Sequence, residues 1–231
     1  MTKPSILITG GAQRIGLHCA RRLVDDGYPV IITCRTQRAE WTEHPLDGIE
    51  VIEADFSTCA GVQALIDQLN DREIRLRALI HNASVWMGDD DSGEAFQQMF
   101  AVHMQTPYLL NQAARRWFEP GQPADIIHMT DYVAQRGARH MAYAATKAGL
   151  ESLTLSFASQ LAPAIKVNSI APSLIMFNDE DDPEYRAKAL AKSALGIEPG
   201  PDVVYQAVRY LLDNPYVTGT CMELNGGRNL R

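Results

Sequence analysis

Short apolar runs alternate with longer amphipathic stretches along almost the whole chain. Several runs are apolar at consecutive positions, which is typical of strands covered by helices on both faces of a sheet. The predicted strands are Ser5–Thr9, Val30–Cys34, Ile49–Ala54, Ala78–His81, Asp125–Met129, Lys166–Ile170 and Cys221–Leu224. The predicted helices are Ile15–Asp26, Val62–Asn70, Phe96–Trp117, Ala142–Leu161 and Val203–Leu212. This order predicts an α/β fold, a single Rossmann-type doubly wound parallel sheet of about seven strands with helices on both faces.

One domain accounts for the whole pattern. No linker, repeat or low-complexity tract divides the 231 residues, so we expect a single catalytic domain over residues 1–231. The segment from Phe177 to Pro201 stands apart, because an acidic run at 179–182 follows a predicted strand. Ligands of open α/β sheets bind beyond the carboxyl ends of the strands, so residues 177–201 are a candidate substrate lid. A solvated connection is the alternative.

Composition removes several classes of function. A net charge of −7 lacks the basic excess that sequence-independent binding to nucleic acid or to an anionic membrane requires. The four cysteines are scattered, so neither a zinc site nor a disulfide framework is expected. The chain begins without a signal-peptide pattern and holds no apolar run of the ~20 residues that span a bilayer. We therefore expect a soluble, cytoplasmic protein without a metal.

A glycine-rich turn follows the first predicted strand and opens the first helix. Its residues Gly10 and Gly16 allow a tight turn, and Arg14 and Ile15 lie between them. The free N–H groups at a helix N-terminus favour a pyrophosphate, which makes the turn a candidate dinucleotide site. An ordinary capped turn is the alternative.

The end of the second predicted strand indicates which dinucleotide would bind. An NAD site places an acidic residue there, about 20 residues after the glycine turn, to accept from the ribose 2′-hydroxyl. This chain has Arg35 and Thr36 instead, and Arg14 is expected to reach the same region. Guanidinium groups pair with a 2′-phosphate, so the expected cofactor is NADPH. Two solvated arginines are the alternative.

The landmarks that follow resemble the short-chain dehydrogenase/reductase family, from Ile6 to Gly227. They occur in that family's order: Thr9-Gly10 to Gly16, Asp55, Asn82-Ala83, Tyr143-x-x-x-Lys147, Asn168 to Pro172, and Asn225-Gly226-Gly227. The resemblance implies that Asp55 and Phe56 contact the adenine and that Asn82 and Ala83 line the adenosine ribose. It also places Pro172 and Ser173 near the nicotinamide, with Ser173 where the family usually has glycine.

Tyr143 and Lys147 are the central catalytic candidates. They are four residues apart on a predicted helix, so they share one face. An ammonium group beside a phenol is expected to stabilise the phenolate and to lower the phenol pKa. The resemblance also implies that Lys147 holds the nicotinamide ribose. A surface Tyr and Lys on an amphipathic helix is the alternative.

The departures from the common family pattern resemble the pteridine reductases. Arg14 replaces a glycine of the turn, Asp131 stands where the catalytic serine is usual, and Trp86 follows Asn82-Ala83-Ser84. A carboxylate would repel a developing oxyanion, whereas it can accept from the N–H groups of a pterin ring. Trp86 would stack the pterin and Ser84 would bind it. Two alternatives stay open: Thr130 in the place of Asp131, and Trp86 as a core aromatic.

The implied reaction is hydride transfer from NADPH to C6 of a 7,8-dihydropterin, such as dihydromonapterin or dihydrofolate. A carbonyl reductase or alcohol dehydrogenase of the same fold is one alternative, and an inactive NADPH-binding sensor is another. His103 stands where much of the family has a catalytic asparagine, and its role is open. The family is usually dimeric or tetrameric, so a homo-oligomer is expected.

Overall fold

The computed structural model describes residues 3–38, 41 and 45–231, and its centre is a parallel sheet. The strand order is β3-β2-β1-β4-β5-β6-β7, and every pairing is parallel. The strands are β1 Ser5–Thr9, β2 Val30–Cys34, β3 Ile49–Glu53, β4 Leu76–His81, β5 Asp125–Met129, β6 Lys166–Pro172 and β7 Cys221–Leu224. The predicted fold class is confirmed.

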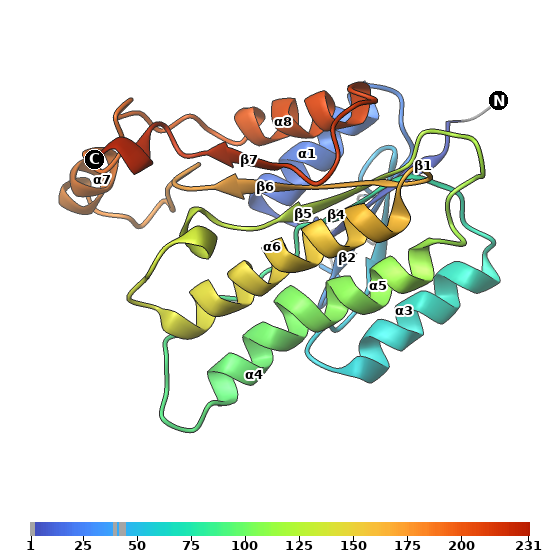
Figure 1. Cartoon of the computed structure of the whole chain (residues 1–231), viewed down its shortest axis with the longest axis horizontal. Coiled ribbons are helices and arrows are strands. Elements are labelled where there is room, and N and C mark those ends of the chain that lie inside the picture. Colours follow the sequence, from blue (N-terminus) through green and yellow to red (C-terminus); the bar gives the residue numbers. More distant parts are fainter. Residues whose placement is uncertain (1–2, 39–40, 42–44) are drawn as a thin grey trace.

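Helices cover both faces of this sheet (Figure 1). Helices α1 and α8 lie on one face, and α3 to α6 lie on the other. The helices are α1 Arg14–Asp25, α3 Cys59–Asp71, α4 Glu94–Phe100, α5 Thr106–Ala114, α6 Met141–Leu161, α7 Pro183–Leu190 and α8 Asp202–Asp213. Alternate strand residues enter the two cores, as Leu7 faces α3 and α5 while Ile8 faces α1 and α8. The sheet is therefore buried on both faces, as its apolar runs predict.

The predicted helix Phe96–Trp117 is interrupted. Residues Ala101–Gln105 form a π-helical turn, η1, between α4 and α5. Thr106 donates to the carbonyl of Ala101 at 2.9 Å across this turn. A π turn adds one residue to the helical repeat and is frequent at functional sites. Here it carries His103, whose side chain is buried.

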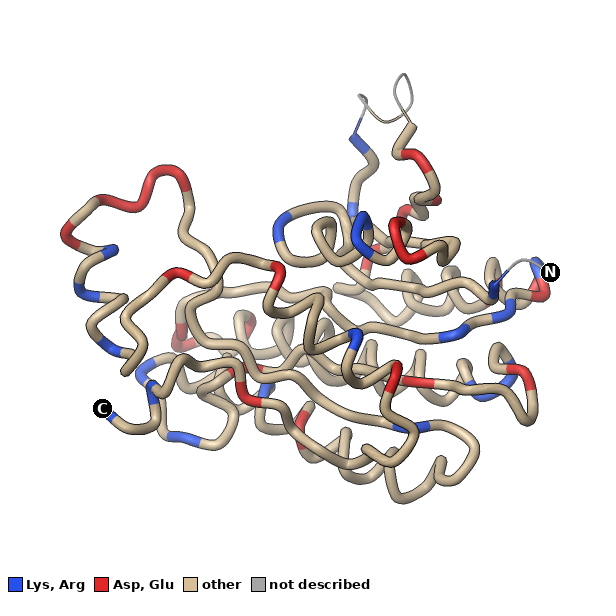
Figure 2. The backbone as a smooth tube through the Cα atoms, turned by 90° about the horizontal axis from the view of Figure 1, so that it is seen from above, with Lys and Arg blue, Asp and Glu red and all other residues tan. Residues whose placement is uncertain are grey.

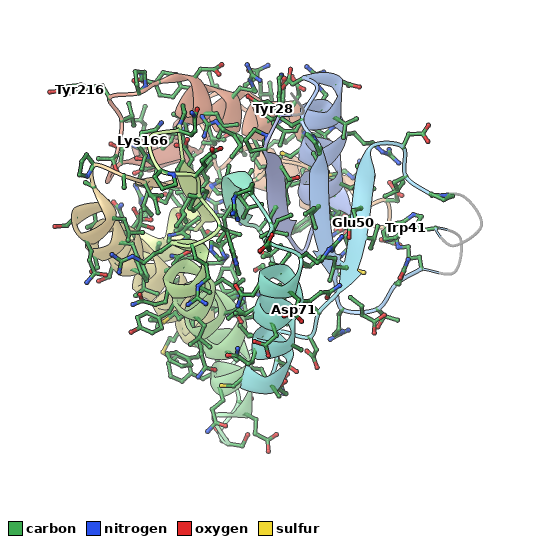
Figure 3. All side chains as sticks on the ribbon, turned by 90° about the vertical axis from the view of Figure 1, so that its right-hand side faces the viewer. Tyr28, Trp41, Glu50, Asp71, Lys166 and Tyr216 are labelled. Carbon is green, nitrogen blue, oxygen red and sulfur yellow. The ribbon has the colours of Figure 1, made fainter. Side chains whose placement is uncertain are left out.

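The strand order reverses between β1 and β4, which are neighbours in the sheet. In open α/β sheets the ligand crevice lies at such a reversal, beyond the carboxyl ends of the strands. Figure 3 looks onto the opposite, amino end, where Lys166 begins β6 and Glu50 lies on the edge strand β3. Different side chains therefore line the amino ends and the carboxyl ends of the strands.

Candidate active site

The glycine turn and the segment after β4 touch each other directly. A Cβ added at Gly10 would lie 2.6 Å from Cα of Ala83, and one at Gly16 would lie 2.6 Å from Nδ2 of Asn82. Gly10 also has φ of 61°, a conformation that favours glycine. Asn82 donates from Nδ2 to the carbonyl of Gly10 at 2.8 Å. This packing explains the glycines and places Asn82 and Ala83 against the turn.

A cleft of about 610 Å³ opens over this junction. It brings together ten of the predicted cofactor residues: Gly10, Arg14, Ile15, Gly16, Arg35, Thr36, Asp55, Phe56, Asn82 and Ala83. Helix α1 begins here, and the residue before it, Gln13, makes no side-chain cap. The first N–H groups of the helix therefore lack that partner, as a site for an anion requires.

Cations gather at one corner of the cleft. Arg35 and Arg38 both line it. The Ser57 N–H and hydroxyl and the nearby charge of Arg35 lower the pKa of Asp55, so this carboxylate stays ionised beside the arginines. The sequence pattern singled out Arg35 and missed Arg38. The signal was present, because Arg38 follows Arg35 by only three residues beyond the end of β2, where the chain bends.

Arg14 has a second function besides lining the cleft. Its guanidinium donates to Oδ1 of Asn178 at 2.5 Å and to the carbonyl of Met176 at 3.1 Å. In this structure Arg14 therefore ties the glycine turn to the segment at 177–201. These contacts occupy both terminal nitrogens of Arg14, so they do not show the expected reach of Arg14 toward a 2′-phosphate.

Tyr143 and Asp131 meet at the carboxyl end of the sheet. The Tyr143 hydroxyl donates to Oδ2 of Asp131 at 3.0 Å, and the N–H of Val133 donates to Oδ1 at 2.9 Å. Thr130 is buried, and its hydroxyl donates to the carbonyl of Ile170 at 3.2 Å. Of the two residues considered for the serine position, Asp131 is the one that contacts Tyr143.

The electrostatics of the pair correct one expectation. Burial, followed by the charge of Asp131, raises the pKa of Tyr143 well above its ordinary value. Lys147 lies 5.7 Å from the centre of the Tyr143 ring, and its ammonium donates to the carbonyl of Met129 at 2.9 Å. Burial lowers the pKa of Lys147 to about 8. The phenol pKa is therefore raised and not lowered as predicted, because burial and then the nearby Asp131 oppose ionisation.

Trp86 borders the site from the segment after β4. Its side chain is 60% exposed, so the alternative of a core aromatic is wrong. Its ring meets His140 edge-on at 5.0 Å. Asp89 fixes the same segment, because its carboxylate accepts from the N–H groups of Met141 and Ala142 at the start of α6. An open aromatic face is therefore held beside the helix that carries Tyr143.

Pro172 ends β6, and Ser173, the next residue, lines a second cavity of about 320 Å³. Arg228 donates to the Ser173 hydroxyl at 2.9 Å. Residues of the 177–201 segment, including Leu195 and Ile197, form the opposite wall. The first cleft thus collects most of the predicted cofactor residues, while Ser173 lies next to the candidate lid.

The acidic run of the candidate lid contributes to local structure. Figure 2 shows it at the end of the molecule where the C-terminus lies. Asp182 accepts from the N–H of Tyr185 and so caps α7, and Asp181 accepts from the N–H of Asn178. The segment is also joined to itself where the Phe177 N–H donates to Glu198 at 2.8 Å. These contacts go beyond a purely solvated connection.

A buried polar chain beneath the site escaped the sequence analysis. His81 pairs with His128 across β4 and β5, and Asn111 contacts Nε2 of both, at 2.7 Å and 3.0 Å. Nδ1 of His128 bonds the Thr154 hydroxyl at 2.8 Å. Burial lowers the pKa of His81 to about 4, so the chain is neutral. The signal was two histidines at the ends of apolar strands.

Within the described ranges, no cluster of three or more His, Cys, Asp or Glu residues could hold a metal ion. None of the helices that the structure describes is long and apolar enough to cross a membrane.

The chain is similar in sequence and fold to several known proteins. Residues 10–229 match the family described as enoyl-(acyl carrier protein) reductase. The chain is 47% identical to dihydromonapterin reductases of Escherichia coli O6:K15:H31 and of Shigella sonnei, over 98% of this chain and 97% of theirs. The crystal structure of FolM alternative dihydrofolate reductase 1 from Brucella suis, in complex with NADP, has a TM-score of 0.89 and 29% identity. That match covers 100% of this chain and 97% of the other.

Proposed function

The chain belongs to the short-chain dehydrogenase/reductase family, and on that premise we propose that it reduces a 7,8-dihydropterin to the tetrahydro form with NADPH. The observation that carries the proposal is the contact between Tyr143 and Asp131, together with the exposed ring of Trp86, which meets His140 at the start of the helix that carries Tyr143. The dihydromonapterin reductases at 47% identity support dihydromonapterin as a substrate, and the Brucella structure supports dihydrofolate.

The residues of the cleft fit NADPH. Gly10 and Gly16 let the turn pack closely against Ala83 and Asn82, with which a Cβ at either position would collide. The start of α1 offers N–H groups to a pyrophosphate. Arg35 lines the corner where a 2′-phosphate needs a cation. When bound, NADPH supplies the hydride that C6 of the dihydropterin accepts. Lys147 and Ser173 are the residues proposed to hold the nicotinamide end.

Tyr143 and Asp131 are proposed to manage the proton. The raised pKa of Tyr143 keeps its phenol neutral, so the hydroxyl is a proton donor and Asp131 its acceptor. Asp131 would also accept from the N–H groups of the ring, which an oxyanion-forming ketone does not offer. After hydride arrives at C6, N5 needs one proton, supplied by water or by this pair.

Trp86 is proposed to stack the pterin ring. Its exposed face offers a flat apolar surface, while Asp89 and His140 restrain the segment that carries it. Ser84 stands between Trp86 and the junction at Ala83, within reach of the heterocycle. Stacking fixes the plane of the ring, which is what a directed hydride transfer requires.

Three further properties belong to the proposal. Residues 1–231 form one catalytic domain, and residues 177–201 close over the substrate as a lid, since Arg14 joins that segment to the glycine turn. The protein is cytoplasmic.

It assembles as a homodimer or homotetramer through the α4–α6 side, where Phe96, Phe100, Tyr108 and Leu155 are exposed apolar side chains. Light scattering on the purified protein tests the assembly, and a monomer would contradict it.

The test compares NADPH oxidation with dihydromonapterin, dihydrobiopterin and dihydrofolate against a panel of aldehydes and ketones. We expect turnover of at least one dihydropterin and weaker turnover of the carbonyl compounds. Turnover of carbonyl compounds alone would replace the proposal by an ordinary carbonyl reductase. NADPH binding without turnover of either class would favour an inactive cofactor-binding protein.

A further inference from the structure

His103 links the two segments that form the candidate substrate site. It lies in the π turn η1 and is 1% exposed. On one side its Nε2 contacts the segment after β4, at Ser84 and Val85. On the other side its Nδ1 contacts Thr146 of α6, the helix that carries Tyr143. The imidazole of His103 therefore links the segment after β4 to helix α6.

The contacts determine which ring nitrogen carries the proton. The N–H of Val85 lies 3.1 Å from Nε2, and a backbone N–H can only donate, so Nε2 has no proton. Nδ1 therefore carries the proton and donates to the Thr146 hydroxyl oxygen at 2.9 Å. That assignment is consistent, because the Thr146 proton is used in a bond to the carbonyl of Tyr143 at 2.9 Å.

The tautomer of His103 in turn orients Ser84. The Ser84 hydroxyl oxygen lies 3.0 Å from the unprotonated Nε2, which can only accept, so the hydroxyl donates its proton to His103 and shares the Nε2 lone pair with the Val85 N–H. The same hydroxyl also interacts with the Tyr143 phenol, so with its proton on His103 the Ser84 oxygen presents only lone pairs to Tyr143 and to a ligand. A serine without this partner could rotate and donate to a ligand oxygen instead. Burial, followed by the charge of Lys147, lowers the pKa of His103 to about 2, so the ring stays neutral.

We propose that His103 is a positioning residue that fixes Ser84 as a hydrogen-bond acceptor, so that Ser84 and Asp131 together select a substrate rich in N–H donors. The inference rests on the proposed function and adds the basis of its specificity. A dihydropterin carries such donors on its ring and amino group. A ketone or aldehyde oxygen offers only lone pairs, which two acceptors repel.

Two substitutions at position 103 separate the acceptor from the other contacts. In His103→Gln the side-chain amide oxygen can reach the position of Nε2 and replace it as the acceptor. In His103→Asn the side chain is shorter, and its amide reaches only the position of Nδ1. For His103→Asn we expect KM for the dihydropterin to rise about tenfold, the effect of one hydrogen bond, with kcat little changed. His103→Gln should recover most of this loss.

A double-mutant cycle with Ser84→Ala identifies the route of the effect. If His103 acts through Ser84, His103→Asn should cost less than about threefold in the Ser84→Ala background, because neighbouring partners are not additive. The ratio of carbonyl to dihydropterin turnover should rise in both single variants. Independent, multiplicative costs with an unchanged ratio would overturn the inference. The NADPH dissociation constant serves as the control and should not change.

The 15N spectrum of histidine-labelled protein tests the tautomer directly. We expect Nε2 of His103 to remain unprotonated and Nδ1 protonated across about pH 5 to 8, where free histidine titrates. A protonated Nε2 would overturn the inference even if every variant folds poorly. Absence of dihydropterin turnover in the unmodified protein would instead overturn the proposed function, while the spectrum still decides the role of His103.

Discussion

Strand β5 begins with an aspartate and a second aspartate follows two residues after its end, and the two carboxylates lie in opposite environments. Asp125 starts the strand, is fully buried, and forms ion pairs with Arg77 and, at 2.9 Å, with Lys166. Asp131 lies just beyond the other end and accepts from the Tyr143 phenol and the Val133 N–H. The first carboxylate is compensated by two cations, whereas the second faces neutral donors.

The difference shows where the fold leaves chemistry available. A buried carboxylate whose two oxygens each lie within ion-pair distance of a cation contributes to the connection between strands. A carboxylate beside a neutral phenol can still accept from a ligand or share a proton. The amino end of the sheet is thus structural, and the carboxyl end, where the cleft opens, is reactive.

Removing the phenol should produce the largest effect. For Tyr143→Phe we expect kcat for dihydropterin reduction to fall by about 10²- to 10⁴-fold, the usual contribution of a positioned acid. The NADPH dissociation constant should stay the same, because the ring remains. Steady-state kinetics with NADPH and dihydromonapterin measure the change, and an unaltered kcat would remove Tyr143 from the chemistry.

Asp125→Asn should show the opposite behaviour. Leaving Arg77 and Lys166 without their shared carboxylate should lower the free energy of unfolding by about 3 kcal/mol, with kcat retained. Urea denaturation measures this loss. Asp131→Asn is the matched variant at the other end of β5, and its free energy of unfolding should change by less than about 1 kcal/mol. Equal destabilisation by both variants would contradict the distinction between the two ends.

Arginines at the two ends should also differ in their effect on the cofactor. Arg35→Ala should weaken NADPH binding about 30-fold, the worth of charge-assisted hydrogen bonds, and leave NADH binding unchanged. Arg72→Ala is the control, because Arg72 pairs with Glu50 at the amino end. Fluorescence titration with both cofactors measures the change. Equal weakening of NADPH and NADH would show that Arg35 does not recognise the 2′-phosphate.

The smallest expected effect is a pH dependence that originates from Lys147. Its pKa is lowered to about 8 by burial, so the ammonium is lost as the pH rises through that value. We expect kcat/KM for NADPH to fall about tenfold per pH unit above it, because kcat/KM reports the free enzyme. A profile that stays flat up to about pH 9.5 would contradict this assignment.

The free energy of unfolding should depend on pH in the opposite direction to the activity. Between about pH 8 and the ordinary lysine pKa of 10.5, the unfolded chain binds more protons at Lys147 than the folded chain does. The contribution of Lys147 to the free energy of unfolding therefore rises with pH in this window. Activity should fall while this contribution increases, which urea titrations at several pH values can separate.

The sequence predicted the sheet more fully than the site. Strands such as β2 and β5 are mostly apolar and are buried at every position, and burial on both faces leaves little alternative to a parallel α/β sheet. The spacing of Tyr143 and Lys147 placed them on one helical face. Spacing alone left Thr130 and Asp131 as alternatives, because it does not give the direction of a side chain at the end of a strand.

Long-range contacts account for what the sequence did not reveal. Arg14 bonds Asn178, which lies 164 residues further along the chain, and no local pattern announces such a contact. The π turn around His103 depends on packing against α6, where Gly149 leaves room for Met104. The phenol pKa follows from burial next to Asp131 rather than from the i and i+4 pair with Lys147.

The most direct test of the account is the rate of deuterium transfer from C4-deuterated NADPH to a dihydropterin, measured side by side for the unmodified protein and Asp131→Asn. We predict deuterium at C6 of the tetrahydropterin, formed at least about 10²-fold more slowly by the variant, because the acceptor loses its charge. Equal rates in the two proteins, or a product without deuterium at C6, would contradict it.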